Sequence, residues 1–142
     1  MAIYSLGVRT TNVTTANACF ELRTAATDRA RLLELGITLA AATASTFGFG
    51  RPAAIGVTPT SPVTWLAEDP AEPAGTAQTA LAWATGPTIP AAFFRRLGLP
   101  ATIGTGIIWT FPRGLALAIS SSVILWNLSA MGASDVYVVG DE

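Results

Sequence analysis

The sequence contains no histidine and no lysine, and this absence limits its chemistry. All eight basic residues of the 142-residue chain are arginines. Histidine is the commonest general base and metal ligand, and lysine is the residue that forms Schiff bases. A Ser-His-Asp or Cys-His arrangement is therefore excluded within one chain. We expect a protein that is not an enzyme, with no catalytic residues and no cofactor.

Cysteine is nearly absent as well. The single cysteine, Cys19, excludes an internal disulfide framework and a cysteine-based metal site. It alternates with Phe20 and Leu22 in the segment ACFELR. This pattern predicts a small packed thiol rather than a nucleophile.

Charge is scarce, and apolar residues are plentiful. Charged residues make up 12% of the chain, about half of the ~25% that is typical, while 51% are hydrophobic. Such a surface must leave sizeable apolar areas, which usually mark contact surfaces. We therefore expect an oligomer or a component of a larger assembly; the alternative is a monomer with a neutral surface. The net charge of −1 argues against nucleic acid as a partner.

Carboxylate chemistry is the catalytic route that the composition leaves open. Glu21 and Glu34 fall on predicted strands and could face each other as a glycosidase pair. Arg23 and Arg31 lie close to them in sequence, so solvent-facing cross-strand ion pairs are the plainer interpretation.

One acidic cluster, formed by Glu68, Asp69 and Glu72, could offer oxygen ligands to Ca²⁺. Pro70 and Pro73 flank these residues, and the spacing is not that of an EF-hand. We therefore predict a solvated loop and no metal site.

The segment between Arg113 and Asp135 carries no charge and is long enough to span a bilayer. Three serines, 120–122, stand together near its middle, with Asn127 and Ser129 following. A pair of strands explains the serines, whereas a membrane helix does not. We expect no membrane partner.

The stretch from Gly104 to Val139 shows the strand pattern most clearly. Apolar residues of odd number recur on both sides of Pro112-Arg113-Gly114, which we predict to be a turn. Val123 to Leu128 is apolar on both parities, as expected of a strand covered on both faces. The odd-numbered apolar residues before and after the turn are Ile107, Trp109, Phe111, Leu115, Leu117 and Ile119.

One segment, Arg29 to Ala42, fits either a helix or a strand. Gly36 disfavours a helix interior, and Ile37 and Thr38 are β-branched, so a strand is favoured. With the other candidates, the count is eight to ten short strands in a single domain over residues 1–142. This count predicts an all-β antiparallel sandwich, jelly-roll-like. The other predicted strands are Ile3–Val8, Ala18–Arg23, Thr46–Gly50, Gln78–Trp83 and Ala91–Leu99, with a brief edge segment at Val63–Leu66.

Two segments are candidates for contact. One is Arg9 to Asn17, an arm or a long loop that could belong to an extended N-terminal arm over about residues 1–17. The other is a Pro-rich loop over 51–76. A large aromatic residue in such a loop, Trp65, either tucks under the loop or anchors a neighbouring subunit. Trp65 could also form a sugar-stacking platform with Phe93 and Phe94, whereas we predict that the other three tryptophans are core. The candidate interface residues are Thr11, Asn12, Val13, Trp65, Phe94 and Arg96.

The chain resembles small virion proteins of tailed bacteriophages. The segments that carry the resemblance are RLLELGITLAAATASTFGFGRPAA and FPRGLALAISSSVILWNL, rich in Ala, Thr and Gly. They are similar in particular to capsid decoration, or cement, proteins built on β-sandwiches. The resemblance implies a structural protein on the capsid surface of a virion, made in the host cytoplasm. It also implies a homo-oligomer, expected to be a trimer, whose partner is the major capsid protein. The alternatives are a tail or fibre-tip domain that binds a receptor or glycan, and a carbohydrate-binding module.

Overall fold

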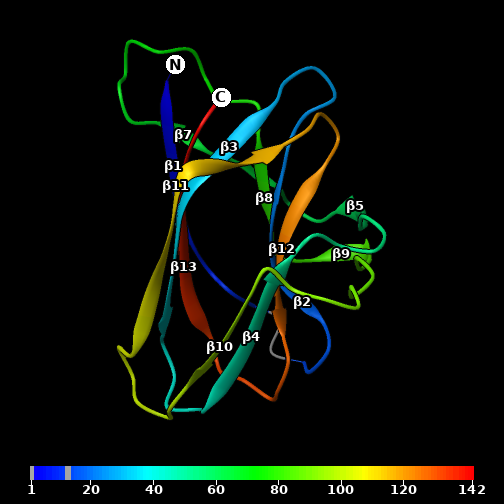
Figure 1. The fold of residues 1–142 in the computed structure, drawn as a ribbon, viewed down its shortest axis with the longest axis vertical. Helices are drawn as coiled ribbons and strands as arrows, with labels where there is room; N and C mark the ends of the chain where they lie inside the picture. The colour runs from blue at the N-terminus through cyan, green and yellow to red at the C-terminus, as the bar shows by residue number, and fades with distance from the viewer. Residues whose placement is uncertain (1, 12–13) are drawn as a thin grey trace.

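The computed structural model describes residues 2–11 and 14–142, which form strands and no helix (Figure 1). Within these residues, five strands form sheet A in the order β11-β3-β13-β1-β7, and six form sheet B in the order β10-β4-β12-β2-β8-β6. A further pair, β5–β9, lies apart from both. The bounds in sheet A are β1 Ile3–Arg9, β3 Ala30–Leu39, β7 Leu66–Ala67, β11 Gly106–Leu117 and β13 Ser134–Asp141. In sheet B they are β2 Ala18–Arg23, β4 Ser45–Gly50, β6 Val63–Thr64, β8 Gln78–Ala80, β10 Arg95–Leu99 and β12 Ser122–Asn127; the separate pair is β5 Val57–Pro59 and β9 Trp83–Thr85.

The predicted all-β antiparallel sandwich is confirmed, and the ambiguous segment is the strand β3. The jelly-roll-like winding stays a prediction. The described residues hold 13 strands rather than eight to ten. The excess comes from very short strands, because closely spaced prolines in residues 51–76 limit each run to two or three residues. The predicted strand Gln78–Trp83 is also divided between β8 and β9.

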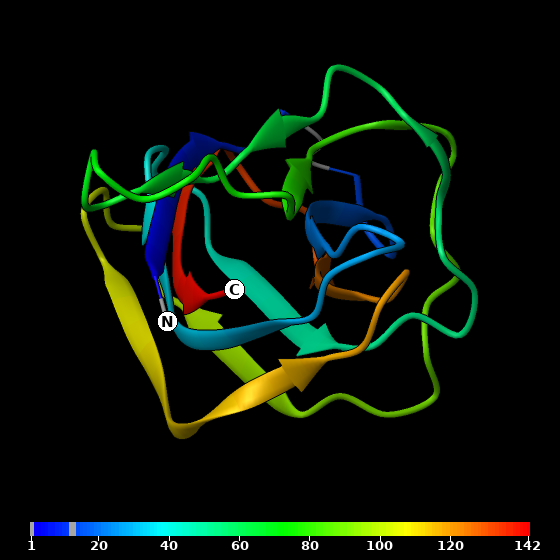
Figure 2. The same ribbon diagram turned by 90° about the horizontal axis from the view of Figure 1, so that it is seen from above.

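The main core lies between the two sheets, and β12 is buried on both of its faces. Val123 and Leu125 belong to the main core, while Ile124 and Trp126 pack in a second cluster on the outer side of sheet B. Trp83 of β9 covers that second cluster. Residues 51–60 and 82–94 form an arc outside β2 and β12 (Figure 2). The prediction of a strand covered on both faces is therefore confirmed.

The predicted turn at Pro112-Arg113-Gly114 is wrong. The strand β11 is 12 residues long and includes these three residues. Its register against β3 shifts between Thr110 and Leu115. The three residues form a bulge, and Gly114 takes the positive φ of 67° that the bulge requires. The odd-numbered apolar residues of β11 on both sides of the bulge contact the core. Ile119 lies beyond the end of the strand and is 49% exposed.

The predicted N-terminal arm is wrong over Ile3–Arg9, where the predicted first strand forms as β1. All seven residues of β1 pair with β13, and β7 pairs on the other side, so β1 is an interior strand. Only the connection after β1 is irregular, and its end is a turn in which Ala16 N donates to Asn127 O at 2.7 Å. Two of the candidate contact residues, Asn12 and Val13, lie outside the described residues.

Within the Pro-rich loop, the chain crosses from sheet B to sheet A at Trp65, between β6 and β7. The Trp65 ring stacks on Tyr4 at 5.3 Å, its indole N–H donates to Glu142 Oε2 at 2.8 Å, and the residue is 1% exposed. A subunit anchor and a sugar platform both need an exposed ring. Those two expectations for Trp65 are therefore wrong, and the alternative that it tucks under the loop is right.

The uncharged segment between Arg113 and Asp135 contains the end of β11, a turn and β12. Among the residues placed by the structure, no helix combines the length and apolarity that crossing a membrane requires.

Candidate functional site

The two carboxylates considered as a catalytic pair lie on different sheets. Glu21 on β2 is buried, accepting from Trp83 Nε1 at 2.6 Å and Arg23 Nη2 at 3.1 Å. Glu34 on β3 accepts from the Tyr137 hydroxyl at 2.5 Å, and this bond raises the pKa of Tyr137. Glu21 forms its ion pair within one strand and away from solvent, so the predicted solvent-facing pair is wrong. Each carboxylate has a structural partner of its own.

The acidic cluster is an exposed turn after β7. Asp69 shapes it, because its Oδ1 accepts from Ala71 N at 2.9 Å and its carbonyl oxygen from Glu72 N at 3.1 Å. Across the residues that can be described, no group of three or more metal-ligating side chains is arranged to hold an ion.

The outer face of sheet A is open, in contrast with the covered outer face of sheet B. We call it the open face. Its side chains form rows across the strands, and Ile108 and Leu66 on it are 57% and 64% exposed. One row is Gly7, Tyr137, Gly36 and Ile108; the next is Leu66, Ser5, Val139, Glu34 and Thr110; a third is Arg9, Asp135 and Thr38.

Tyr137 is the largest side chain of the open face, and two glycines flank it. A Cβ on Gly36 would overlap the Tyr137 ring, so only glycine lets the ring lie flat over β3. On the other side, Gly7 leaves a shallow hollow of about 420 Å³ between Tyr137 and the Arg9–Asp135 ion pair. The open face therefore has a shallow depression beside Tyr137.

A second surface lies where β10 and β11, the edge strands of the two sheets, come together. Here two guanidinium groups lie over phenylalanine rings at 5.8 to 5.9 Å from the ring centroid: Arg51 over Phe94 and Arg95 over Phe111. Arg96, the next residue along β10, lies over Phe93 on the outer face of sheet B. Phe94 is 42% exposed, and all of these arginines are exposed. With Arg113 of the bulge, which lines a hollow beside Arg95 and Phe111, we call this surface the arginine–phenylalanine edge.

The arginines of this edge have no carboxylate partner in the described parts of the chain. Ion pairs within 4.0 Å there join only Arg9 to Asp135 and Arg23 to Glu21. Arg51 donates to a backbone carbonyl, Ala116 O, at 2.6 Å. Guanidinium groups that are exposed and held over aromatic rings can bind carboxylates from a partner.

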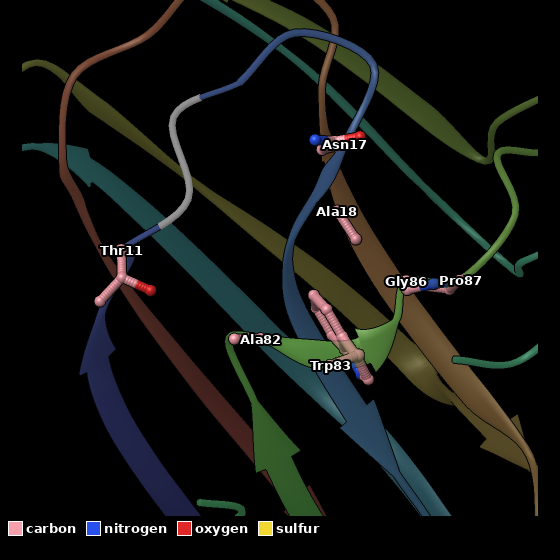
Figure 3. Close-up of a pocket in the computed structure, with 7 residues that line it drawn as sticks. All are labelled: Thr11, Asn17, Ala18, Ala82, Trp83, Gly86 and Pro87. Atoms are coloured by element: carbon pink, nitrogen blue, oxygen red, sulfur yellow. The ribbon is translucent and has the colours of Figure 1, made fainter. Parts of the chain in front are cut away.

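A groove of about 390 Å³ lies beside the covered face of sheet B (Figure 3). Thr11 stands on one side of it, Asn17 and Ala18 on another, and Trp83 at its base. Trp83 also packs on the second core cluster, and its indole N–H is used by Glu21. The ring is therefore primarily a structural element of the sandwich.

The structure divides the predicted interface residues among different places. Phe94 belongs to the arginine–phenylalanine edge, and Arg96 lies over Phe93 on the outer face of sheet B. Thr11 lies at the groove, and Trp65 is in the core. Sequence reasoning missed Arg51, Arg95 and Arg113 as members of the edge. The sequence does hold one sign of such a surface: four of its eight basic residues are arginines that lie close in sequence to phenylalanines.

The fold and these surfaces define the chain as an all-β antiparallel sandwich with an open face and a cationic, aromatic edge. No protein family matches the chain, and neither a curated protein nor a solved structure is similar to it.

Proposed function

We propose that the protein is a structural virion protein of the decoration type, which binds a phage capsid through the open face of sheet A. The observation that carries the proposal is the asymmetry of the sandwich. The chain covers the outer face of sheet B with its own residues, whereas Ile108 and Leu66 stay exposed on the open face. Together with the resemblance of the sequence to cement proteins, this favours a role in which one face lies against a larger surface.

The chemistry of the open face suits a repeated, moderate contact. Burying Ile108, Leu66 and the half-buried Val139 contributes about 25 cal/mol per Å² of apolar area. Much of this gain is offset by the translational and rotational freedom lost on association. Copies that also contact one another on a symmetric shell gain avidity, so a modest contact per copy is sufficient.

The test uses a charge placed in the open face. Ile108→Asp puts a carboxylate where the proposed contact is apolar, and Ile108 is exposed, so the fold is retained. In co-sedimentation with empty capsids assembled from the major capsid protein of the same virus, we expect at least a tenfold loss of occupancy.

The matched control is Ile119→Asp, because Ile119 has a similar exposure of 49% in the turn before β12. It should bind capsids as the unmodified chain does. The proposal fails if the unmodified chain does not co-sediment with capsids, or if both variants bind equally well.

A further inference from the structure

The two edges of sheet A differ in charge. At one edge, β11 carries Arg113 and faces Arg95 of β10, within the arginine–phenylalanine edge. At the other edge, β7 leads directly into the turn that bears Glu68, Asp69 and Glu72, all of them exposed. No described carboxylate pairs with the first group, and no described arginine pairs with the second.

The acidic turn is held in one conformation before any partner arrives. Glu68 N donates to Ile3 O at 2.9 Å, which fixes the start of the turn to β1. The side chain and carbonyl oxygen of Asp69 close it through Ala71 and Glu72. The carboxylates of Glu68 and Glu72 take no part in these bonds, so they can accept hydrogen bonds from a partner, and binding orders their side chains rather than the backbone of the turn.

The acidic turn and the arginine–phenylalanine edge cannot meet within one molecule. Three strands, β3, β13 and β1, separate β11 from β7 in the sheet. In Figure 1 the turn projects at the top of the molecule beside the chain ends, and in Figure 2 it lies across the sandwich from β10 and β11. Within one molecule, therefore, the carboxylates of this turn do not reach these arginines.

We propose that a second copy of the chain supplies the carboxylates, and that its acidic turn docks on the arginine–phenylalanine edge. Arginine binds carboxylates in a bidentate geometry, and Phe94 offers apolar surface among the guanidinium groups. A contact between unlike surfaces is head-to-tail, and it produces a ring where the rotation closes. The contact leaves the open face free and does not depend on the proposed capsid binding.

The experiment is charge reversal, read out as the mass of the purified chain by sedimentation equilibrium in low salt. The unmodified chain should be larger than a monomer. Arg95→Glu with Arg113→Glu should raise the dissociation constant at least ~10-fold, as should Glu68→Arg with Glu72→Arg. A chain with all four reversals should associate again, since both surfaces have exchanged sign. Raising the salt concentration should weaken the unmodified oligomer.

Two controls separate a change at this interface from a general effect of net charge or of unfolding. Arg29→Glu changes the net charge at an exposed arginine outside the edge, and it should leave the mass unchanged. Thermal unfolding of each variant shows that the fold is kept. A monomeric unmodified chain would overturn the proposal, as would unchanged masses in both double variants. Dissociation of the oligomer by Ile108→Asp, without dissociation by the charge reversals, would also overturn the proposal. Because no capsid is present, failure here is distinct from failure of capsid binding.

Discussion

Among single residues, many polar side chains form hydrogen bonds with residues that are distant in the sequence. The buried thiol of Cys19 donates to Leu125 O at 3.3 Å, and burial raises its pKa well above that of a free thiol. Glu142 accepts from Trp65 Nε1 and from Thr76 N, both at 2.8 Å, which ties the end of the described chain to the Pro-rich loop. These contacts stabilise the sandwich.

The Arg9–Asp135 ion pair gives a pH-dependent prediction at the scale of single residues. Arg9 donates two hydrogen bonds, at 2.7 and 2.9 Å, and these lower the pKa of Asp135 below its usual value of 3.8. Because the carboxyl pKa is lowered in the folded chain, the ion pair gives its full stabilisation at pH values above the usual pKa. This stabilisation is lost as the pH falls through the folded-state pKa.

The measurement is an NMR titration of the Asp135 carboxyl carbon in the folded chain. Its midpoint should lie below 3.8, and Arg9→Gln should move it up toward the usual range. The pair is exposed and screened by salt, so the overall unfolding transition should change little. A midpoint that is the same with and without Arg9 would show that the ion pair does not form in solution.

At the scale of elements, the packing of Tyr137 over β3 predicts unequal effects of two similar substitutions. Gly36→Ala places a Cβ inside the Tyr137 ring, so we expect a loss of about 1–3 kcal/mol in the free energy of unfolding. Gly7→Ala places a Cβ in ordinary contact, 3.8 Å from the Tyr137 Cβ, and should change stability by only about ±0.5 kcal/mol.

Urea unfolding of the two variants checks this difference. The cost of Gly36→Ala should shrink when Tyr137 is also changed to alanine, because the overlap is then absent and the two effects are not additive. Equal costs for the two glycine substitutions would mean that the ring does not lie over Gly36.

The strands were predictable where burial is periodic, and the irregular segments were not. Burial of β12 on both faces follows from the unbroken apolar run Val123 to Trp126, and the structure confirms it. Pro112-Arg113-Gly114 suits a turn and a bulge equally well, because both need a residue with positive φ. Nothing local to Trp65 shows that its partners are Tyr4 and Glu142, which lie more than 60 residues away.

At the scale of the whole molecule, the candidate surfaces depend on strand order, which spacing does not encode. Phe94 was predicted from sequence as a contact residue, yet Arg51, Arg95 and Arg113 join it only because β4, β10 and β11 meet at one side of the sandwich. The acidic turn is separated from them for the same reason. The low charge of the chain led us to expect association, and the surfaces proposed for it could be chosen only once the order of the strands was known.

We propose that the open face of sheet A lies on a capsid while the two edges of the sheet join neighbouring copies. Electron cryomicroscopy of capsids incubated with the purified chain tests it most directly. We predict added density in which the open face, with Ile108 and Tyr137, lies against the shell and the acidic turn of one copy meets the arginine–phenylalanine edge of the next. Capsids without added density, or copies that lie on the shell with the covered face of sheet B, would contradict it.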